Sequence, residues 1–320
     1  MSLRAFAVFL LLGVAVRADF ITDDIFQEVG NFEKCKSMFK SLTAATATDE
    51  EAFDVKPEEA FQGIGDSDTR PYNAKYWPNK RVPYELMDGL SREQKKKIAC
   101  GMQFFKELTC IRLVPKEDSD KDYIHFQDTS GGCFTEQIGM KGGKHVINYK
   151  KDSGCWSLGT IIHEIMHAIG FPHEQARDDR DGWIKVHWDN IGSDYWRYQF
   201  IKSSGYHPLQ YDYGSVMHYP SLWYTETPYM SAKREPVDTN NRKMGQRVEP
   251  SQLDIQKINH MYQCSGGGGS QSTQKTTQKT TQRPTDCKDE YPTNTCEAWK
   301  SHCSRNSNVR KVCNKTCGVC

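Results

Sequence analysis

The chain has 320 residues, 42 basic and 41 acidic side chains and a formal net charge of +1. This length exceeds that of one typical domain, and the basic residues are interleaved with acidic ones, which argues against a nucleic-acid-binding patch. The twelve cysteines predict disulfides formed in an oxidising compartment.

Residues 1–18 have the pattern of a secretory signal peptide. Arg4 precedes an apolar stretch over residues 5–16, and small residues suit cleavage before Asp19. That stretch is too short to span a membrane, and no other segment is long and apolar enough to do so. We therefore expect a secreted, extracellular protein without a membrane span; storage in a venom or secretory organelle is compatible with this.

Residues 19–70 form an acidic leader, with 13 acidic against 5 basic side chains. Short helical patterns occur there beside Ala/Thr-rich sequence, and little in the segment could build a core alone. We interpret the leader as a removable, inhibitory propeptide that ends somewhere between residues 65 and 75. A solvated acidic helix face is the alternative.

Residues 71–264 have the aromatic and apolar content of a folded α+β domain. Ser91 is placed to cap a helix. One face of this helix carries Ile98, Met102, Phe105 and Thr109. Cys100 lies opposite that face, where we expect it to be accessible. Short strands are predicted at residues 111–114, 123–126 and 145–149, followed by a second helix from about Ser157.

Residues 265–286 contain no large apolar side chain and are rich in Gly, Thr and Gln, which predicts a flexible linker. The tail over residues 287–320 has six cysteines in 34 residues. Because so small a unit needs disulfides to fold, we expect a separate disulfide-rich module. The secretory context disfavours the alternative, a zinc knuckle.

The run HEIMHAIGFPH has the spacing of a metal site. His163 and His167 are four residues apart, so on a helix they share one face and can bind one metal ion. Glu164 lies beside the first ligand, where its carboxylate can reach a water on the metal. Gly170 ends the helix in a left-handed conformation, and the turn brings His173 round as a third ligand.

Three ligands leave the fourth tetrahedral position open to water, which is typical of a catalytic zinc site. A chance match to the short HExxH pattern is the alternative, and the extended eleven-residue form argues against coincidence.

Together with residues 174–181 (EQARDDRD) and 215–219 (SVMHY), this run closely resembles the astacin family of metzincin endopeptidases. The resemblance covers about residues 76–264. It implies a catalytic domain of two subdomains separated by a zinc cleft. The upper subdomain has a twisted mixed sheet with helices, and the lower one is mostly irregular.

The resemblance also implies roles for single residues. One Zn²⁺ ion per catalytic domain is bound by His163, His167 and His173. Glu164 is the general base and acid, and Met217 forms the apolar floor under the metal. Tyr219 is an additional zinc ligand that leaves the metal when substrate binds. Its free phenol then donates a hydrogen bond to the tetrahedral intermediate.

Three further residues follow from the resemblance. Glu174 is the expected partner of the N-terminus freed by activation. Arg247 lines the primed-side pocket, where it would pair with an acidic substrate residue; an exposed surface arginine is the alternative. The family's propeptide motif starts here as FQG, but Ile64 follows where the family has an aspartate that blocks the zinc. Asp66, the nearest acid, is therefore the predicted zymogen switch, with a solvated loop acid as the alternative.

The family's two disulfides correspond here to Cys110–Cys264 and Cys133–Cys155. Cys35 and Cys100 are left over. A bridge between them would tether the leader after cleavage, and two independent thiols are an equally supported alternative.

The tail resembles the ShKT module, which is related to potassium-channel toxins of sea anemones. This resemblance implies the pairs Cys287–Cys320, Cys296–Cys313 and Cys303–Cys317. Channel-blocking members have a Lys-Tyr pair between the third and fourth cysteines, whereas this chain has Lys311 there and no tyrosine. Asn314 begins a formal glycosylation sequon.

The sequence therefore predicts a secreted zinc endopeptidase, made as a zymogen, that acts on proteins or peptides. The combination with an ShKT module is of a cnidarian or nematode type and suggests an extracellular target for that module. The alternative function is a toxin or binding protein that acts on a channel or receptor through its ShKT module, with the protease as carrier.

Overall fold

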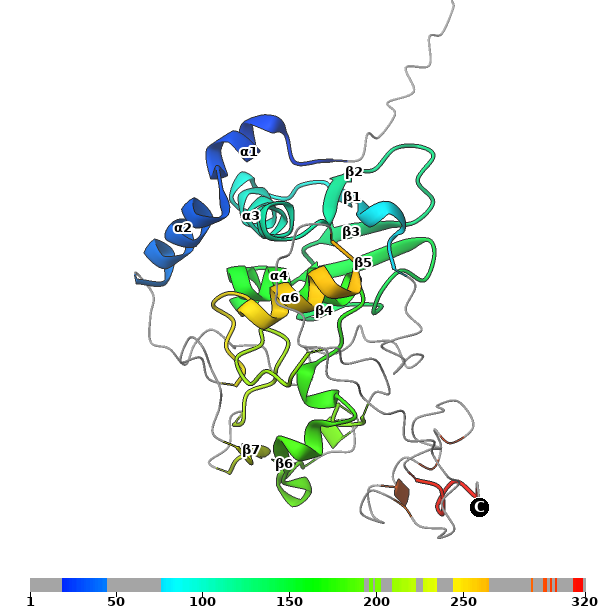
Figure 1. Cartoon of the computed structure of the whole chain (residues 1–320). Coiled ribbons are helices and arrows are strands. Elements are labelled where there is room, and N and C mark those ends of the chain that lie inside the picture. Colours follow the sequence, from blue (N-terminus) through cyan, green and yellow to red (C-terminus); the bar gives the residue numbers. More distant parts are fainter. Residues whose placement is uncertain are drawn as a thin grey trace, which may run out of the picture.

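The computed structural model describes residues 19–44, 76–192, 196–197, 199–202, 209–222, 227–234 and 244–264, together with tail residues 289, 296–297, 300, 303 and 313–318. The main domain, over residues 76–264, has an upper half built on a five-stranded sheet and a lower half with little regular structure (Figure 1). The α+β, two-subdomain fold expected from the sequence is confirmed. In the described ranges, no helix is long and apolar enough to cross a membrane.

The sheet of the upper half has the strand order β2-β1-β3-β5-β4. Its strands are β1 (Arg81–Leu86), β2 (Arg112–Pro115), β3 (Tyr123–Gln127), β4 (Cys133–Thr135) and β5 (Lys144–Tyr149). All neighbours are parallel except β4, which runs antiparallel to β5. The three strands predicted from the sequence correspond to β2, β3 and β5.

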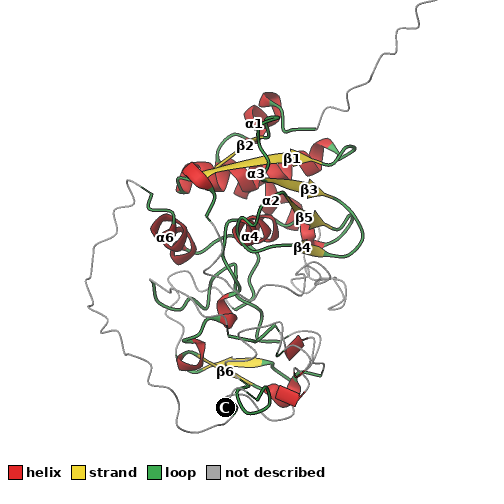
Figure 2. Cartoon of the chain, turned by 90° about the vertical axis from the view of Figure 1, so that its right-hand side faces the viewer, coloured by secondary structure: helices red, strands yellow, loops and turns green. Residues whose placement is uncertain are grey.

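Two helices, α3 (Arg92–Leu108) and α4 (Leu158–Ala168), pack against each other beside this sheet (Figure 2). The predicted start of α3 is confirmed, since Ser91 and Gln94 form a reciprocal capping box. Gly101 permits the close approach of the two helices: a Cβ atom there would lie 2.6 Å from Cγ2 of Ile161. The helix that carries the metal motif is thereby held on the core.

The leader contributes two helices, α1 (Asp23–Val29) and α2 (Phe32–Ala44), which lie against α3 (Figure 1). Val29, Phe32 and Cys35 are buried in the same core cluster as α3, and the rings of Phe32 and Phe104 are 5.3 Å apart. Cys35 forms a disulfide with Cys100. Of the two alternatives left open by the sequence, the structure has the bridge.

The expectation that Cys100 is accessible is wrong. Cys100 is fully buried, and all residues of α3 from Ile98 to Phe105 are buried. A helix that packs on a sheet normally buries one face. Here the leader covers the face that the periodicity of the sequence assigned to solvent.

Complementary charges line the contact between the leader and α3. Arg92 forms ion pairs with Asp24 and Glu28 at 2.8 and 2.9 Å, and Lys95 pairs with Asp19. The acidic composition of the leader thus matches the basic start of α3, although exposed pairs contribute little to stability.

The lower half is formed mainly by turns, short 3-10 helices and one two-stranded antiparallel sheet. The described 3-10 helices that follow α4 are η4 (Glu174–Ala176), η5 (Arg180–Gly182) and η6 (Trp188–Asn190). Two others belong to the upper half, where η2 (Pro78–Lys80) precedes β1 and η3 (Gly154–Trp156) precedes α4. The small sheet pairs β6 (Ile184–Val186) with β7 (Met230–Ala232). An aromatic cluster that includes Phe200, Tyr211 and Tyr219 forms the core of this half.

The helix α6 (Gln252–Met261) returns to the upper half and lies beside α4 (Figures 1 and 2). The hydroxyl of Tyr262, just after α6, donates to the backbone carbonyl of Ile169, just after α4, at 2.8 Å. This contact joins the end of the main domain to the helix of the metal motif.

Further disulfides join Cys110 with Cys264, Cys133 with Cys155, Cys296 with Cys313 and Cys303 with Cys317. These are the pairings that the two resemblances imply. Cys287 and Cys320, the remaining expected pair, lie outside the described residues. No described cysteine is free.

Replacing both Cys35 and Cys100 by alanine should lower the free energy of unfolding by about 2–4 kcal/mol, because the bridge constrains the unfolded chain. Urea unfolding followed by tryptophan fluorescence measures this loss. The control, Ser130→Ala at an exposed loop position, should leave the transition unchanged. Equal midpoints for the core variant and the unaltered protein would contradict the stabilising role.

Candidate metal centre

The helix α4 presents two histidines of the motif on one buried face. Ser157 caps its start by accepting a hydrogen bond from the N–H of Thr160. At its end, Gly170 has a φ of 111°, and the N–H groups of Gly170 and Phe171 donate to carbonyls of the last turn at 2.9 Å. This hydrogen-bond pattern is a Schellman motif, which requires a left-handed residue and explains the glycine. The predicted end of the helix is confirmed.

The turn after Gly170 brings His173 to the histidines of α4. One nitrogen from each of His163, His167 and His173 lies within 4.8 Å of the other two, and the Nε2 atoms of His167 and His173 are 3.2 Å apart. The side chains are only 5, 3 and 7% exposed. Three imidazoles at this separation fit the coordination sphere of one metal ion.

Backbone carbonyls set the direction of two of these rings. Nδ1 of His163 donates to the carbonyl of Val216 at 2.8 Å, and Nδ1 of His167 donates to the carbonyl of Phe171 at 2.7 Å. With Nδ1 used in this way, Nε2 is the atom left to bind a metal. Burial lowers the pKa of all three imidazoles, that of His167 to about 4. The rings are therefore neutral at pH 7, the form that binds metal ions.

Glu164 is buried beside the histidines and is held by the sheet. The hydroxyl of Thr135, in β4, lies 2.8 Å from Oε2 of Glu164 and 2.9 Å from its backbone carbonyl. Burial raises the pKa of the Glu164 carboxyl to about 7, although the hydrogen bond from Thr135 and the charge of Arg247 act to lower it. A carboxyl group in this range can accept and return a proton at neutral pH.

Met217 and Tyr219 lie close to the third histidine, in the segment that follows residue 214. Met217 is buried, and its carbonyl accepts a hydrogen bond from the N–H of Glu174 at 3.0 Å. The ring centroid of Tyr219 is 4.3 Å from that of His173. Its backbone N–H donates to Oε1 of Gln175 at 3.0 Å. The phenol of Tyr219 is thereby packed directly against one candidate ligand.

Glu174 makes contacts that its expected role does not include. Its Oε1 accepts hydrogen bonds from Nζ of Lys257 at 2.8 Å, from Nη1 of Arg177 at 3.1 Å and from the N–H of Asp212 at 2.9 Å. Burial would raise the pKa of Glu174, but the charges of Lys257 and Arg177 outweigh burial and lower it to about 2. Glu174 is therefore an ionised, buried carboxylate with two cations from the chain itself.

Arg247 is partly buried, and its charge acts on the carboxylate of Glu164. Its Nη1 donates to the carbonyls of His218 and Gln246 at 3.0 Å. Burial lowers its pKa to about 10, so the guanidinium stays charged at neutral pH. Gly159 in α4 allows the backbone of Arg247 to approach, since a Cβ there would lie 2.1 Å from the Arg247 carbonyl oxygen.

Some predicted residues lie outside the described ranges, and some important ones were not predicted. Asp66 and the whole of residues 45–75 lie outside the described ranges. The residues whose contacts at the site were not predicted include Thr135, Gln175, Lys257 and Asp254. Of these, only Asp254 carries a local signal, because Ser251 and Asp254 have the spacing of a capping box.

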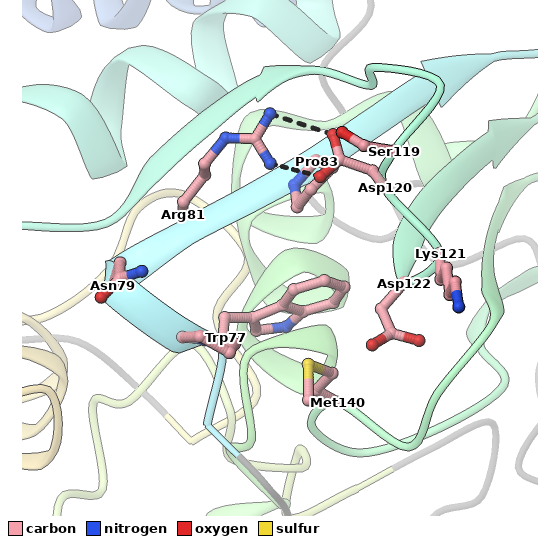
Figure 3. Close-up of a pocket in the computed structure, with 10 residues that line it drawn as sticks. Trp77, Asn79, Arg81, Pro83, Ser119, Asp120, Lys121, Asp122 and Met140 are labelled. Atoms are coloured by element: carbon pink, nitrogen blue, oxygen red, sulfur yellow. Dashed lines mark hydrogen bonds and ion pairs between the residues drawn. The ribbon is translucent and has the colours of Figure 1, made fainter.

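A cavity of about 330 Å³ lies near the start of the domain (Figure 3). It is lined by residues that include Trp77, Asp122 and Met140. Arg81 and Asp120, which also line it, form an ion pair. None of its lining residues belongs to the histidine group. Trp77 instead supports the metal helix, since its indole N–H donates to the carbonyl of Ala168 at 2.9 Å.

Known proteins share the domain that contains this histidine group. The family model described as astacin, a peptidase family, matches residues 69–263. Zinc metalloproteinase nas-14 of Caenorhabditis elegans is 38% identical over 202 residues, which are 60% of this chain and 38% of nas-14. Zinc metalloproteinase nas-8 of the same organism is 33% identical over 262 residues, 76% of this chain and 62% of nas-8. The chain thus spans between about two fifths and three fifths of the length of these two relatives.

Among solved structures, high choriolytic enzyme 1, a hatching enzyme zinc-protease from Oryzias latipes, superposes with a TM-score of 0.52 at 31% identity. The match covers 60% of this chain and 94% of that structure. The fold and the family model agree on the type of catalytic domain. The chain belongs to the astacin family of zinc metalloendopeptidases.

Proposed function

We propose that this chain is a secreted endopeptidase that hydrolyses peptide bonds in extracellular proteins and is made as a zymogen. The buried group of His163, His167 and His173, with Glu164 beside it, is the observation that carries the proposal. Three neutral imidazoles this close together are a donor set suited to one zinc ion.

In such a site, zinc supplies Lewis acidity that activates water and polarises the scissile carbonyl. Glu164 accepts the proton of the attacking water and later delivers it to the leaving amine. Thr135 keeps the Glu164 carboxylate in the orientation that this transfer needs. Tyr219 is the donor for the negative charge that develops on the carbonyl oxygen.

The contacts of the leader support a zymogen in which part of the propeptide stays attached after cleavage. Cleavage between residues 65 and 75 would cut the chain beside Asp66 and let this residue move away from the metal site. Residues 19–44 would stay attached, because Cys35 is joined to Cys100 and the leader helices are part of the core. The active enzyme would then have two chains. Asp66 remains the proposed switch.

The proposed alternative, a binding protein that acts through the ShKT tail, stays a prediction. The segment between Cys303 and Cys313, where channel-blocking members carry their functional pair, lies outside the described residues.

Glu164→Gln should lower the hydrolysis rate by a factor of at least about 100, because the general base is lost. Zinc content should stay at the level of the unaltered enzyme, since the three histidines are intact. Turnover of a quenched fluorescent peptide and atomic absorption measure the two effects. Glu93→Gln, an exposed acid on α3, is the matched control. Full turnover by Glu164→Gln would reject the assignment.

Arg247→Gln should weaken selection of Asp or Glu after the scissile bond by about tenfold or more, the value of a charged hydrogen bond. Cleavage of a peptide library by both enzymes measures this preference. Hydrolysis of peptides with an alanine at that position should change far less. An unaltered enzyme without any preference for acidic residues would refute the assigned pocket.

Proteolytic activation should yield a protein that runs as one species on a non-reducing denaturing gel and as two after reduction. The Cys35→Ala/Cys100→Ala variant is the control, and its fragments should separate without reductant. Release of residues 19–44 from the unaltered protein without reductant would show that the leader is not retained.

A further inference from the structure

Two buried side chains of α6 reach the segments that hold the metal site. Asp254 and Lys257 are one helical turn apart, and they are 0 and 7% exposed. Both are far from His173 in the sequence. A charged side chain is rarely buried unless it is paired, so the partners of these two residues indicate what they do.

Asp254 holds the backbone on which the first histidine depends. Its Oδ1 accepts from the hydroxyl of Ser215 at 2.5 Å, and its Oδ2 accepts from the N–H of Val216 at 2.9 Å. The carbonyl of Val216 is the acceptor for Nδ1 of His163. A single residue of backbone therefore separates the α6 carboxylate from a candidate zinc ligand.

Lys257 holds the segment of the third histidine. Glu174, which directly follows His173, bonds with its N–H to the carbonyl of Met217 and with its carboxylate to Lys257. The second cation at Glu174, Arg177, is shared, because it also forms two hydrogen bonds with Asp179 at 2.9 and 2.8 Å. Lys257 thus supplies an ammonium group in direct contact with the buried carboxylate.

An ammonium at Glu174 is what the sequence led us to expect from the N-terminus freed by activation. In this chain, Oε1 of Glu174 already contacts the ammonium group of a side chain of α6. An ion pair that is already formed within the domain does not depend on where the leader is cut.

We propose that Lys257 is a positioning residue of the metal centre: its ammonium neutralises Glu174, so that α6 holds the third-ligand segment and the Met217 turn in place without a free N-terminus. The inference rests on the proposed zinc site. It goes beyond the proposed function because it states that the metal site is already assembled before the leader is cut. Proteolysis is then needed only to give the substrate access to the site.

The test compares Lys257→Met, which keeps the aliphatic stem, with Lys257→Arg, which keeps the charge, in the full chain. Zinc affinity is measured by competition with a chromogenic chelator, and the site geometry by the visible spectrum of the Co²⁺-substituted protein. Lys257→Met should lose about 10- to 100-fold in zinc affinity, as is usual when a supporting residue of a metal site is removed. Lys257→Arg should restore most of that affinity and the Co²⁺ spectrum.

A second variant separates the charge pair from simple loss of packing. Glu174→Gln combined with Lys257→Met removes both members of the pair, so that no buried carboxylate is left short of a cation. Its zinc affinity should exceed that of Lys257→Met alone. If Lys257→Met fails to fold, the double variant decides, and its failure to recover folding and zinc binding overturns the proposal. Lys96→Met, an ion-paired lysine on α3, is the control and should bind zinc normally.

The last arm addresses the N-terminus. Activated enzyme prepared with a short extension before its new N-terminus should keep its zinc affinity and its Co²⁺ spectrum. A loss of about tenfold on extension, or unchanged zinc affinity in Lys257→Met, would overturn the proposal, since a supporting residue is expected to change affinity by at least that factor. Because these readouts measure metal binding, they remain valid if the protein fails to hydrolyse peptides, an outcome that would reject the proposed function alone.

Discussion

The hydrogen bonds from the histidine Nδ1 atoms to backbone carbonyls are the constraint on which the site depends. His163 uses the carbonyl of Val216, and His167 uses that of Phe171. Each bond fixes a ring orientation and directs Nε2 to the centre of the group. One acceptor belongs to the turn at the end of α4, whereas the other comes from the lower half. The rings of His163 and His167 therefore point to the centre of the group only if both acceptor carbonyls are placed correctly relative to α4.

The lower half achieves this placement with little regular secondary structure. Its turns are held by buried polar groups, among them Asp212, whose carboxylate accepts from the N–H of Gly214 and from the hydroxyl of Ser251. Burial of a polar group destabilises the fold unless its hydrogen bonds are made, so such a network tolerates few alternative geometries. This explains how an irregular segment can hold Met217 and Tyr219 in defined positions. It also explains why α6, which supplies Asp254 and Lys257 to this network, contributes to the metal site.

The leader shows how tertiary packing overrides a local pattern. The apolar periodicity of residues 91–109 predicts one buried face, and the helix itself was predicted correctly. The second face also carries residues that need burial, including Phe104 and Cys100, and the sheet cannot cover both. The leader helices cover the remainder with Val29 and Phe32. An acidic segment that cannot form a core alone is stable here because it completes the core of another unit.

Local sequence alone was enough to predict three strands of the sheet, the capped helix α3, the helix of the metal motif, its end at Gly170 and the histidine spacing. These features depend on apolar periodicity and on the backbone freedom of glycine, and both can be recognised from a few neighbouring residues. The burial of Cys100, the support of Glu164 by Thr135 and the contact of Lys257 with Glu174 emerged only from the folded chain. Each of these contacts joins segments that are far apart in the sequence, and no local spacing specifies which of many threonines or lysines meets a given carboxylate.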